Sequence, residues 1–304
     1  MREIAVADEL VELTVDDTPV TGHVYTTPPD PGSGPRPAVV LCTGFSGTQD
    51  TPSIVAAAEA FARAGFVATT FDYRSFGTSG GTPRQVVTVP GQLRDIRAVV
   101  AHVRARPDVA ADRVALWGSS LGGGHVLTIA AEDPGVAAVV AQVPFNGFPR
   151  RVEGRSARHT ARLLGAILLD AARGRLGRPP VYAKAVGRPD ELAVMVSPEA
   201  ERTIEVLTSH TWRNEVAARS LLSMMRYRPG DGVGRIRAPL LVCLAEGDRE
   251  TGASTNAHLA DTAPRGTLRT YPVTHFDVYR PEVRARLLQD QTDFLLRAGV
   301  RPGC

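Results

Sequence analysis

The stretch that decides the fold reads Trp117-Gly118-Ser119-Ser120-Leu121-Gly122-Gly123-Gly124-His125. It follows an apolar run, Arg113 to Trp117, and it precedes an alanine-rich segment, Val126 to Glu132. An apolar run, a turn of small residues and an alanine-rich segment together predict a strand, a tight turn and a helix. The turn between strand and helix is therefore the first place to look for chemistry.

Gly118, Ser120 and Gly122 match the pattern Gly-x-Ser-x-Gly, which holds a nucleophilic serine on a sharp strand-to-helix turn. A side chain at either glycine would collide with the neighbouring strand or helix. The start of the helix also favours developing negative charge. Ser119 does not fit the pattern. A glycine-rich turn without chemistry is the alternative, whereas a phosphate-binding loop is disfavoured because no Gly-Lys-Ser/Thr follows.

Composition is that of an ordinary globular protein. The 304 residues can bury a large core, and 43% are hydrophobic and 22% charged. The net charge is +3, and 34 of the 35 basic residues are arginines scattered among carboxylates, so we expect no nucleic-acid partner.

Three cysteines cannot build a disulfide framework. The acidic N-terminus does not resemble a signal peptide and no apolar run is long enough for a membrane span, so we predict a cytoplasmic protein without membrane contact.

Strand and helix signals alternate along most of the chain. Two alternating segments before residue 27 predict an antiparallel hairpin, and continuous apolar runs predict strands buried on both faces of a sheet. Ala38 to Cys42 is such a run, and further strands are predicted at Phe66 to Phe71, Val136 to Val143, Pro239 to Ala245 and Gly266 to Tyr271. The alternation predicts an α/β fold with a mostly parallel sheet flanked by helices.

The alternation stops between residues 148 and 234. This part has no convincing strand signal, and it contains candidate helices at Ala157 to Arg173, Pro198 to Leu207 and Trp212 to Arg226. We therefore expect a first core part at residues 1–147, an inserted all-helical cap at 148–234, and a second core part at 235–304. A separate helical domain is a weaker interpretation because both flanks are needed to complete the sheet.

Two more candidate catalytic residues follow predicted strands. Serine needs an adjacent base, which in turn needs an orienting carboxylate, and such groups gather at the carboxyl ends of parallel strands. Asp248 comes directly after one strand, and His275 comes shortly after the last. The order Ser120, Asp248, His275 is the one expected for such a sheet. Glu246 and Asp277 are rival carboxylates, although Asp277 is very near His275 in sequence.

An acyl-transfer site also needs two donors for the oxyanion. The backbone N–H of Leu121, the residue after the nucleophile, supplies one. The other is expected from the loop that follows Cys42, where Phe45 after Gly44 is best placed. An ordinary strand-to-helix turn is the alternative interpretation of this loop.

These pieces resemble the α/β-hydrolase superfamily, and the pattern is closest to dienelactone-hydrolase-like and prolyl-peptidase-like bacterial serine hydrolases with a helical cap. The motifs that carry the resemblance are Thr43-Gly44-Phe45, Asp72 to Ser79, Gly118 to Gly122, Gly247-Asp248 and His275 to Tyr279. The resemblance implies an α/β-hydrolase fold and a catalytic triad. The family usually has histidine where this chain has Thr43, which puts the details of the oxyanion loop in doubt.

The sequence thus predicts a serine hydrolase that cleaves a carboxylic ester, thioester or lactone through an acyl-enzyme on Ser120, without cofactor or metal. The expected partner is a small acyl substrate, and a homo-oligomer is possible. Trp212 and Met225 are candidate substrate contacts from the cap. Two alternatives stay open: a C–C bond hydrolase or acyltransferase acting on a diketone or polyketide-like substrate, and a catalytically inactive binding protein.

Overall fold

A computed structural model describes residues 5–29, 32–148, 156–196 and 204–300. Its main feature is an eight-stranded sheet in the order β1-β2-β4-β3-β5-β6-β10-β11. The strands are β1 (Ala7–Val15), β2 (Thr18–Thr26), β3 (Arg36–Cys42), β4 (Val67–Phe71), β5 (Val109–Ser119), β6 (Val139–Gln142), β10 (Leu240–Ala245) and β11 (Gly266–Tyr271). β1 and β2 pair antiparallel, as do β2 and β4, and all other neighbours are parallel. The predicted α/β architecture and the N-terminal hairpin are confirmed.

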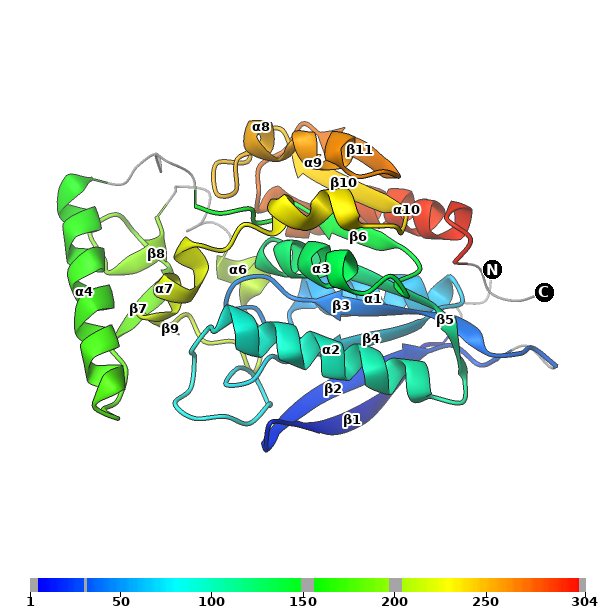
Figure 1. The fold of residues 1–304 in the computed structure, drawn as a ribbon, viewed down its shortest axis with the longest axis horizontal. Helices are drawn as coiled ribbons and strands as arrows, with labels where there is room; N and C mark the ends of the chain where they lie inside the picture. Colours follow the sequence, from blue (N-terminus) through cyan, green and yellow to red (C-terminus); the bar gives the residue numbers. More distant parts are fainter. Residues whose placement is uncertain (1–4, 30–31, 149–155, 197–203, 301–304) are drawn as a thin grey trace.

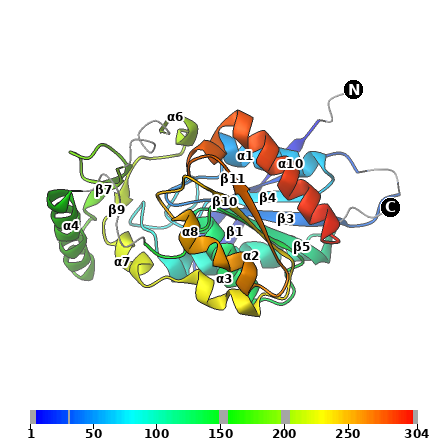
Figure 2. The same ribbon diagram turned by 90° about the horizontal axis from the view of Figure 1, so that it is seen from above.

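Helices cover both faces of this sheet (Figures 1 and 2). One buried apolar cluster packs α1 (Pro52–Arg63) and α10 (Pro281–Arg297) onto one face, with Phe61 and Leu295 fully buried. A second cluster packs α2 (Val89–Ala105), α3 (Leu121–Glu132) and α9 (His258–Thr262) onto the other face. The central strands are buried on both sides, which explains their continuous apolar sequences.

Loops at the carboxyl ends of the strands carry the short remaining core elements. They are α8 (Ala253–Asn256) after β10 and the 3₁₀ helix η2 (Asp277–Tyr279) after β11. The segment from Ala253 to Thr262 is divided into α8 and α9 (His258–Thr262) at Ala257. No helix in the described ranges is both long and apolar enough to cross a membrane.

The inserted segment, residues 148–234, lies between β6 and β10 and corrects one prediction. It holds a three-stranded sheet in the order β8-β7-β9, so the predicted all-helical cap is wrong (Figure 1). Its elements are α4 (Ala157–Arg175), β7 (Tyr182–Val186), β8 (Ala193–Met195), α6 (Ile204–Leu207), β9 (Val216–Ala217), α7 (Ser220–Met225) and the 3₁₀ helix η1 (Pro229–Arg235), which runs one residue past the segment. Strands of two to five residues are too short to show a period of two in the sequence. The first part of the helix predicted at Pro198 to Leu207 lies outside the described residues.

Candidate active site

Ser120 stands at the turn between β5 and α3 in a strained backbone conformation, with φ 54° and ψ −118°. Positive φ is costly for a residue with a side chain and persists only where surrounding contacts impose it. Those contacts are present: the Ser120 N–H donates to the Gln142 carbonyl at 2.9 Å, and the Ser120 carbonyl accepts from Phe145 N at 2.8 Å. Neighbouring strand β6 and the loop after it therefore hold the turn in shape.

The two glycines of the motif are required by close packing. A Cβ at Gly118 would lie 2.2 Å from the Gly122 carbonyl oxygen. A Cβ at Gly122 would lie 2.2 Å from the Cys42 carbonyl oxygen on β3. Both obstacles are backbone atoms that cannot rotate away, so any larger residue would displace the turn.

Asp248 and His275 form a buried pair. The Nδ1 of His275 lies 2.8 Å from Oδ2 of Asp248, and their side chains are 4% and 2% exposed. The carboxylate also accepts hydrogen bonds from the Thr251 hydroxyl at 2.6 Å and from the backbone N–H groups of Glu250 and Thr251, each at 2.9 Å. These donors fix the carboxylate, so Nδ1 carries the proton and Nε2 is the remaining ring nitrogen.

The electrostatics of the pair favour an ionised carboxylate. Burial alone would raise the pKa of Asp248, but the charge and hydrogen bond of His275, with the Thr251 hydroxyl, outweigh burial and lower the pKa to about 2. Burial alone would lower the pKa of His275, but the Asp248 carboxylate outweighs burial and raises it. A carboxylate held in this way orients the imidazole and stabilises its protonated form.

Ser120 and His275 line one pocket, together with Thr43, Gly44 and Phe45. Across the described ranges, Ser120 Oγ and His275 form no direct hydrogen bond. Contacts between nucleophile and base are often long before substrate binds, and they tighten in the complex. The structure therefore brings the three predicted residues to one end of the sheet, with the imidazole paired to Asp248 and facing the same space as Ser120.

The loop after β3 packs directly against the serine. A Cβ at Gly44 would lie 3.2 Å from Cβ of Ser120, so only glycine allows this approach without displacement. Gly47 N donates to the Gly44 carbonyl at 3.1 Å, and the Thr43 hydroxyl donates to the Gly47 carbonyl at 3.2 Å. Thr43 thus stabilises this loop by a hydrogen bond within it, at the position where the family usually has histidine. Within the described residues, the backbone N–H groups of Phe45 and Leu121 have no hydrogen-bond acceptor and both residues line the space beside Ser120.

The rival residues have other contacts. The Ser119 hydroxyl is buried and lies 2.9 Å from the Tyr279 hydroxyl and 3.1 Å from Gln142 Nε2. Asp277 accepts from the backbone N–H and the hydroxyl of Thr274, while Glu246 is exposed. Asp248 is therefore the carboxylate that faces His275.

Comparison with known proteins agrees with this geometry. The family model described as "Serine aminopeptidase, S33" matches residues 33–275. The chain belongs to this family of α/β hydrolases. It is an enzyme of the α/β-hydrolase fold, as the sequence predicted.

Relatives of this α/β hydrolase span nearly the whole chain. The quorum-quenching protein AidA of Acinetobacter baumannii (strain MDR-ZJ06) is 34% identical over 94% of this chain and 94% of its own. The thiohydrolase apmlB of Arthrinium phaeospermum is 29% identical over 95% of this chain and 96% of its own. The crystal structure of the α/β hydrolase GrgF from Penicillium sp. sh18 superimposes with a TM-score of 0.79 at 22% identity, covering 97% of this chain and 99% of that one.

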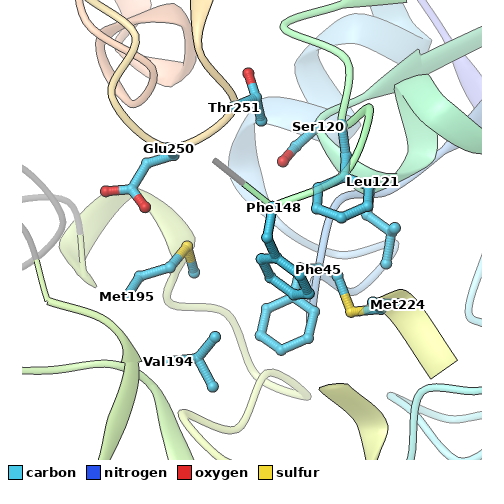
Figure 3. A pocket seen from close by; sticks show the side chains of 10 residues that line it. Phe45, Ser120, Leu121, Phe148, Val194, Met195, Met224, Glu250 and Thr251 are labelled. Carbon is cyan, nitrogen blue, oxygen red and sulfur yellow. The ribbon is translucent and has the colours of Figure 1, made fainter. Parts of the chain in front are cut away.

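Two pockets of this α/β hydrolase meet at Ser120. The Met224 pocket and the Leu207 pocket are both narrow, with cavity volumes of about 60 Å³ and 40 Å³. Ser120, Phe45 and Met195 line both. The Met224 pocket is otherwise lined by Leu121, Phe145, Phe148, Val194, Met224, Glu250 and Thr251 (Figure 3). The Leu207 pocket is otherwise lined by Thr43, Gly44, Gly47, Thr51, Ser53, Ile54, Ser119, Leu207, His275, Phe276 and Tyr279.

The predicted contacts from the inserted segment are not among these lining residues. Met225 is 50% exposed on α7, and its neighbour Met224 lines the pocket instead, because consecutive helical residues point about 100° apart. Trp212 lies outside both pockets. Sequence reasoning missed Val194 and Met195 on β8, since a three-residue strand leaves no pattern that would single them out.

Proposed function

We propose that this enzyme is a serine hydrolase that cleaves a carboxylic ester, thioester or lactone through an acyl-enzyme on Ser120. The observation that carries the proposal is the buried Asp248–His275 pair beside a serine held on a strained turn. The largely apolar lining of both pockets supports an acyl substrate. The name of one relative, a thiohydrolase, supports hydrolysis at an acyl carbon bound to sulfur.

In the proposed first step, Ser120 Oγ attacks the substrate carbonyl while its proton passes to Nε2 of His275. The N–H groups of Phe45 and Leu121 hold the oxyanion. The tetrahedral intermediate then collapses: the bond from carbon to the leaving oxygen or sulfur breaks, and His275 returns the proton to the leaving group. Asp248 holds the ring in the correct tautomer and stabilises its charge throughout.

In the second step, His275 takes a proton from water, and the hydroxide oxygen attacks the acyl-enzyme. The ester bond to Ser120 breaks, Ser120 recovers the proton, and the acid leaves. A thiol, alcohol or amine in place of water would give acyl transfer by the same residues. Cleavage of a C–C bond would follow the same two steps, with carbon as the leaving atom in place of oxygen or sulfur.

The test is covalent labelling with a fluorophosphonate, followed by peptide mass spectrometry. We expect one adduct, on Ser120, and none on the S120A variant, while S119A is still labelled. An adduct elsewhere, or none on the folded wild-type protein, would overturn the proposal. Acid release from matched aryl ester, thioester, lactone and β-diketone substrates, with and without an added amine, then separates hydrolysis from C–C cleavage and acyl transfer.

A further inference from the structure

Glu250 is an unusual member of the Met224 pocket. Among the described residues that line this pocket, it is the only one with a formal charge, and most of the others are apolar (Figure 3). The other polar group next to it, the Thr251 hydroxyl, already donates to Asp248 at 2.6 Å. Apart from the nucleophile Ser120, the Glu250 carboxylate is therefore the polar side chain of this pocket that is left for a ligand.

The position of Glu250 is fixed by the catalytic loop itself. Its backbone N–H donates to Asp248 Oδ1 at 2.9 Å, so the residue cannot move far without disturbing the pair with His275. Its side chain lies near Met195, across the pocket from Leu121 and Met224 (Figure 3). Within the described part of the chain, no arginine or lysine forms an ion pair with it.

A carboxylate at the wall of an apolar pocket discriminates by charge. Its attraction for an ammonium group and its repulsion of another carboxylate are both stronger there than in water. A neutral donor, such as an amide N–H or a hydroxyl, also gains a charge-assisted hydrogen bond. A substrate that brings a carboxylate to this wall leaves two like charges facing each other, which rejects it.

We propose that Glu250 determines specificity, so that the Met224 pocket selects substrates with an ammonium or neutral hydrogen-bond donor beside an apolar chain and rejects those with a carboxylate there. This inference depends on the proposed acyl-enzyme function. It goes beyond that function by naming the class of substrate. The carboxylate also has a second effect, because together with Asp248 it raises the pKa of His275, the base.

The experiment compares E250Q with wild type and with E246Q as the matched control. Glu246 lies in the same loop, two residues before Asp248, but it is exposed and does not line either pocket. Two series of aryl thioesters are used, at two chain lengths each. In one series the acyl chain ends in ammonium, methyl or carboxylate. In the other, these groups are carried on the leaving group.

In at least one series, we expect the wild-type kcat/KM to be highest for ammonium and lowest for carboxylate. E250Q should lower the ammonium-to-carboxylate ratio in that series by about tenfold or more, as one close charge pair predicts. E246Q should leave the ratio within about twofold. The acid limb of the pH–rate profile of E250Q should also shift to lower pH, because loss of the negative charge lowers the pKa of the base.

Three outcomes each overturn either the inference on Glu250 or the proposed function. If fluorophosphonate labels Ser120 in both proteins but the ratio stays within twofold in both series, the inference on Glu250 is wrong and the hydrolase function stands. If neither protein is labelled nor turns over any thioester, the proposed function itself fails. If E246Q changes the ammonium-to-carboxylate ratio as much as E250Q does, the inference is also wrong. The overall negative charge of the loop would then explain the selectivity.

Discussion

The eight-stranded core and the inserted segment are held together by different contacts. In the core, long strands are buried on both faces between two apolar clusters. The inserted segment shares these clusters through side chains such as Leu163, Ile167 and Leu221, and polar side chains add further contacts between its elements. Asp170 on α4 accepts from the N–H groups of Val181 and Arg219, each at 2.8 Å, and Asn214 donates to and accepts from the Val186 backbone.

The two regions also contribute differently to the site. Ser120, Asp248 and His275 all come from core loops. Val194, Met195, Leu207 and Met224, which line the pockets, come from the inserted segment. The reacting groups therefore come from the core, and side chains of the inserted segment help to shape the pockets. A change in the inserted segment should alter substrate choice, whereas a change in the core loops should alter the rate of reaction itself.

The largest expected effect is on the core side of this comparison. S120A should lower kcat/KM by roughly 10⁶-fold, because the nucleophile is lost and the remaining groups act only through binding and the oxyanion donors. The melting temperature should stay within about 2 °C, since the side chain is small and the backbone contacts of the turn remain. Initial rates and thermal melts measure the two effects. A variant that retained a tenth of the activity would contradict the assignment of Ser120.

The second prediction tests whether the inserted segment is held by its polar contacts. D170A should destabilise this segment by about 3 kcal/mol, because it leaves two backbone donors and a nearby arginine without their buried acceptor. Hydrogen exchange should speed up at α4, β7 and β9 and stay slow at β3 and β5. KM should rise more than kcat falls. If hydrogen exchange speeds up equally in β3 and β5, the core and the inserted segment unfold as one unit. The difference between the two regions would then be wrong.

The same difference explains what the sequence could predict. The core strand β10 falls on a continuous apolar run, and β11 has the predicted limits, Gly266 to Tyr271. Asp248 and His275 could be located because each follows such a strand. Strands β8 and β9, of three and two residues, have no such signal, and β9 pairs with β7 across a long stretch of sequence, Tyr182 with Ala217.

Pocket residues show the same limit. Glu250 is near Asp248 in sequence, but nothing in the sequence says that its side chain faces the pocket. Met224 and Met225 are equally apolar and adjacent, and only packing of the short helix α7 decides which one lines the pocket. What depends on local pattern could be predicted, and what depends on the orientation of a short element could not.

The third prediction concerns the junction of the two regions. His125 on α3 is fully buried between Gln92 on α2 and Tyr227, which follows α7, at 3.0 Å from each. Burial lowers the pKa of His125 to about 3. An unfolded histidine keeps a pKa of about 6.5, so the unfolded state takes up the proton first and stability falls as pH drops from 6.5 toward 3.

At pH 5 this histidine should cost about 2 kcal/mol of folding stability relative to pH 8. H125Q, which cannot take up that proton, should show a shallower loss over the same range. Urea unfolding of both proteins at several pH values measures the difference. Parallel stability curves would mean that His125 takes up its proton without unfolding, and that the junction is looser than the buried contacts indicate.

The smallest expected effect is at Ser119, next to the nucleophile and in the same core. Its hydroxyl belongs to a buried chain of hydrogen bonds that runs from Trp117 through Gln291 and Gln142 to Ser119 and Tyr279. The Tyr279 ring centroid lies 6.3 Å from that of His275, so this chain supports the base from behind. S119A removes one link and leaves the buried Gln142 amide and Tyr279 hydroxyl without this partner, which should cost about 1–2 kcal/mol of stability.

Activity of S119A should fall less than about tenfold, and mainly in kcat. The reason is that a slightly more mobile His275 is less often in position to accept the proton of Ser120. Y279F, which removes the adjoining hydroxyl, is the matched variant and should show a loss of similar size. Steady-state kinetics of both variants beside S120A give the comparison directly. A loss in S119A as large as that in S120A, with normal melting, would mean that the neighbouring hydroxyl takes part in the reaction, and that the backbone turn at Ser120 does not by itself select the nucleophile.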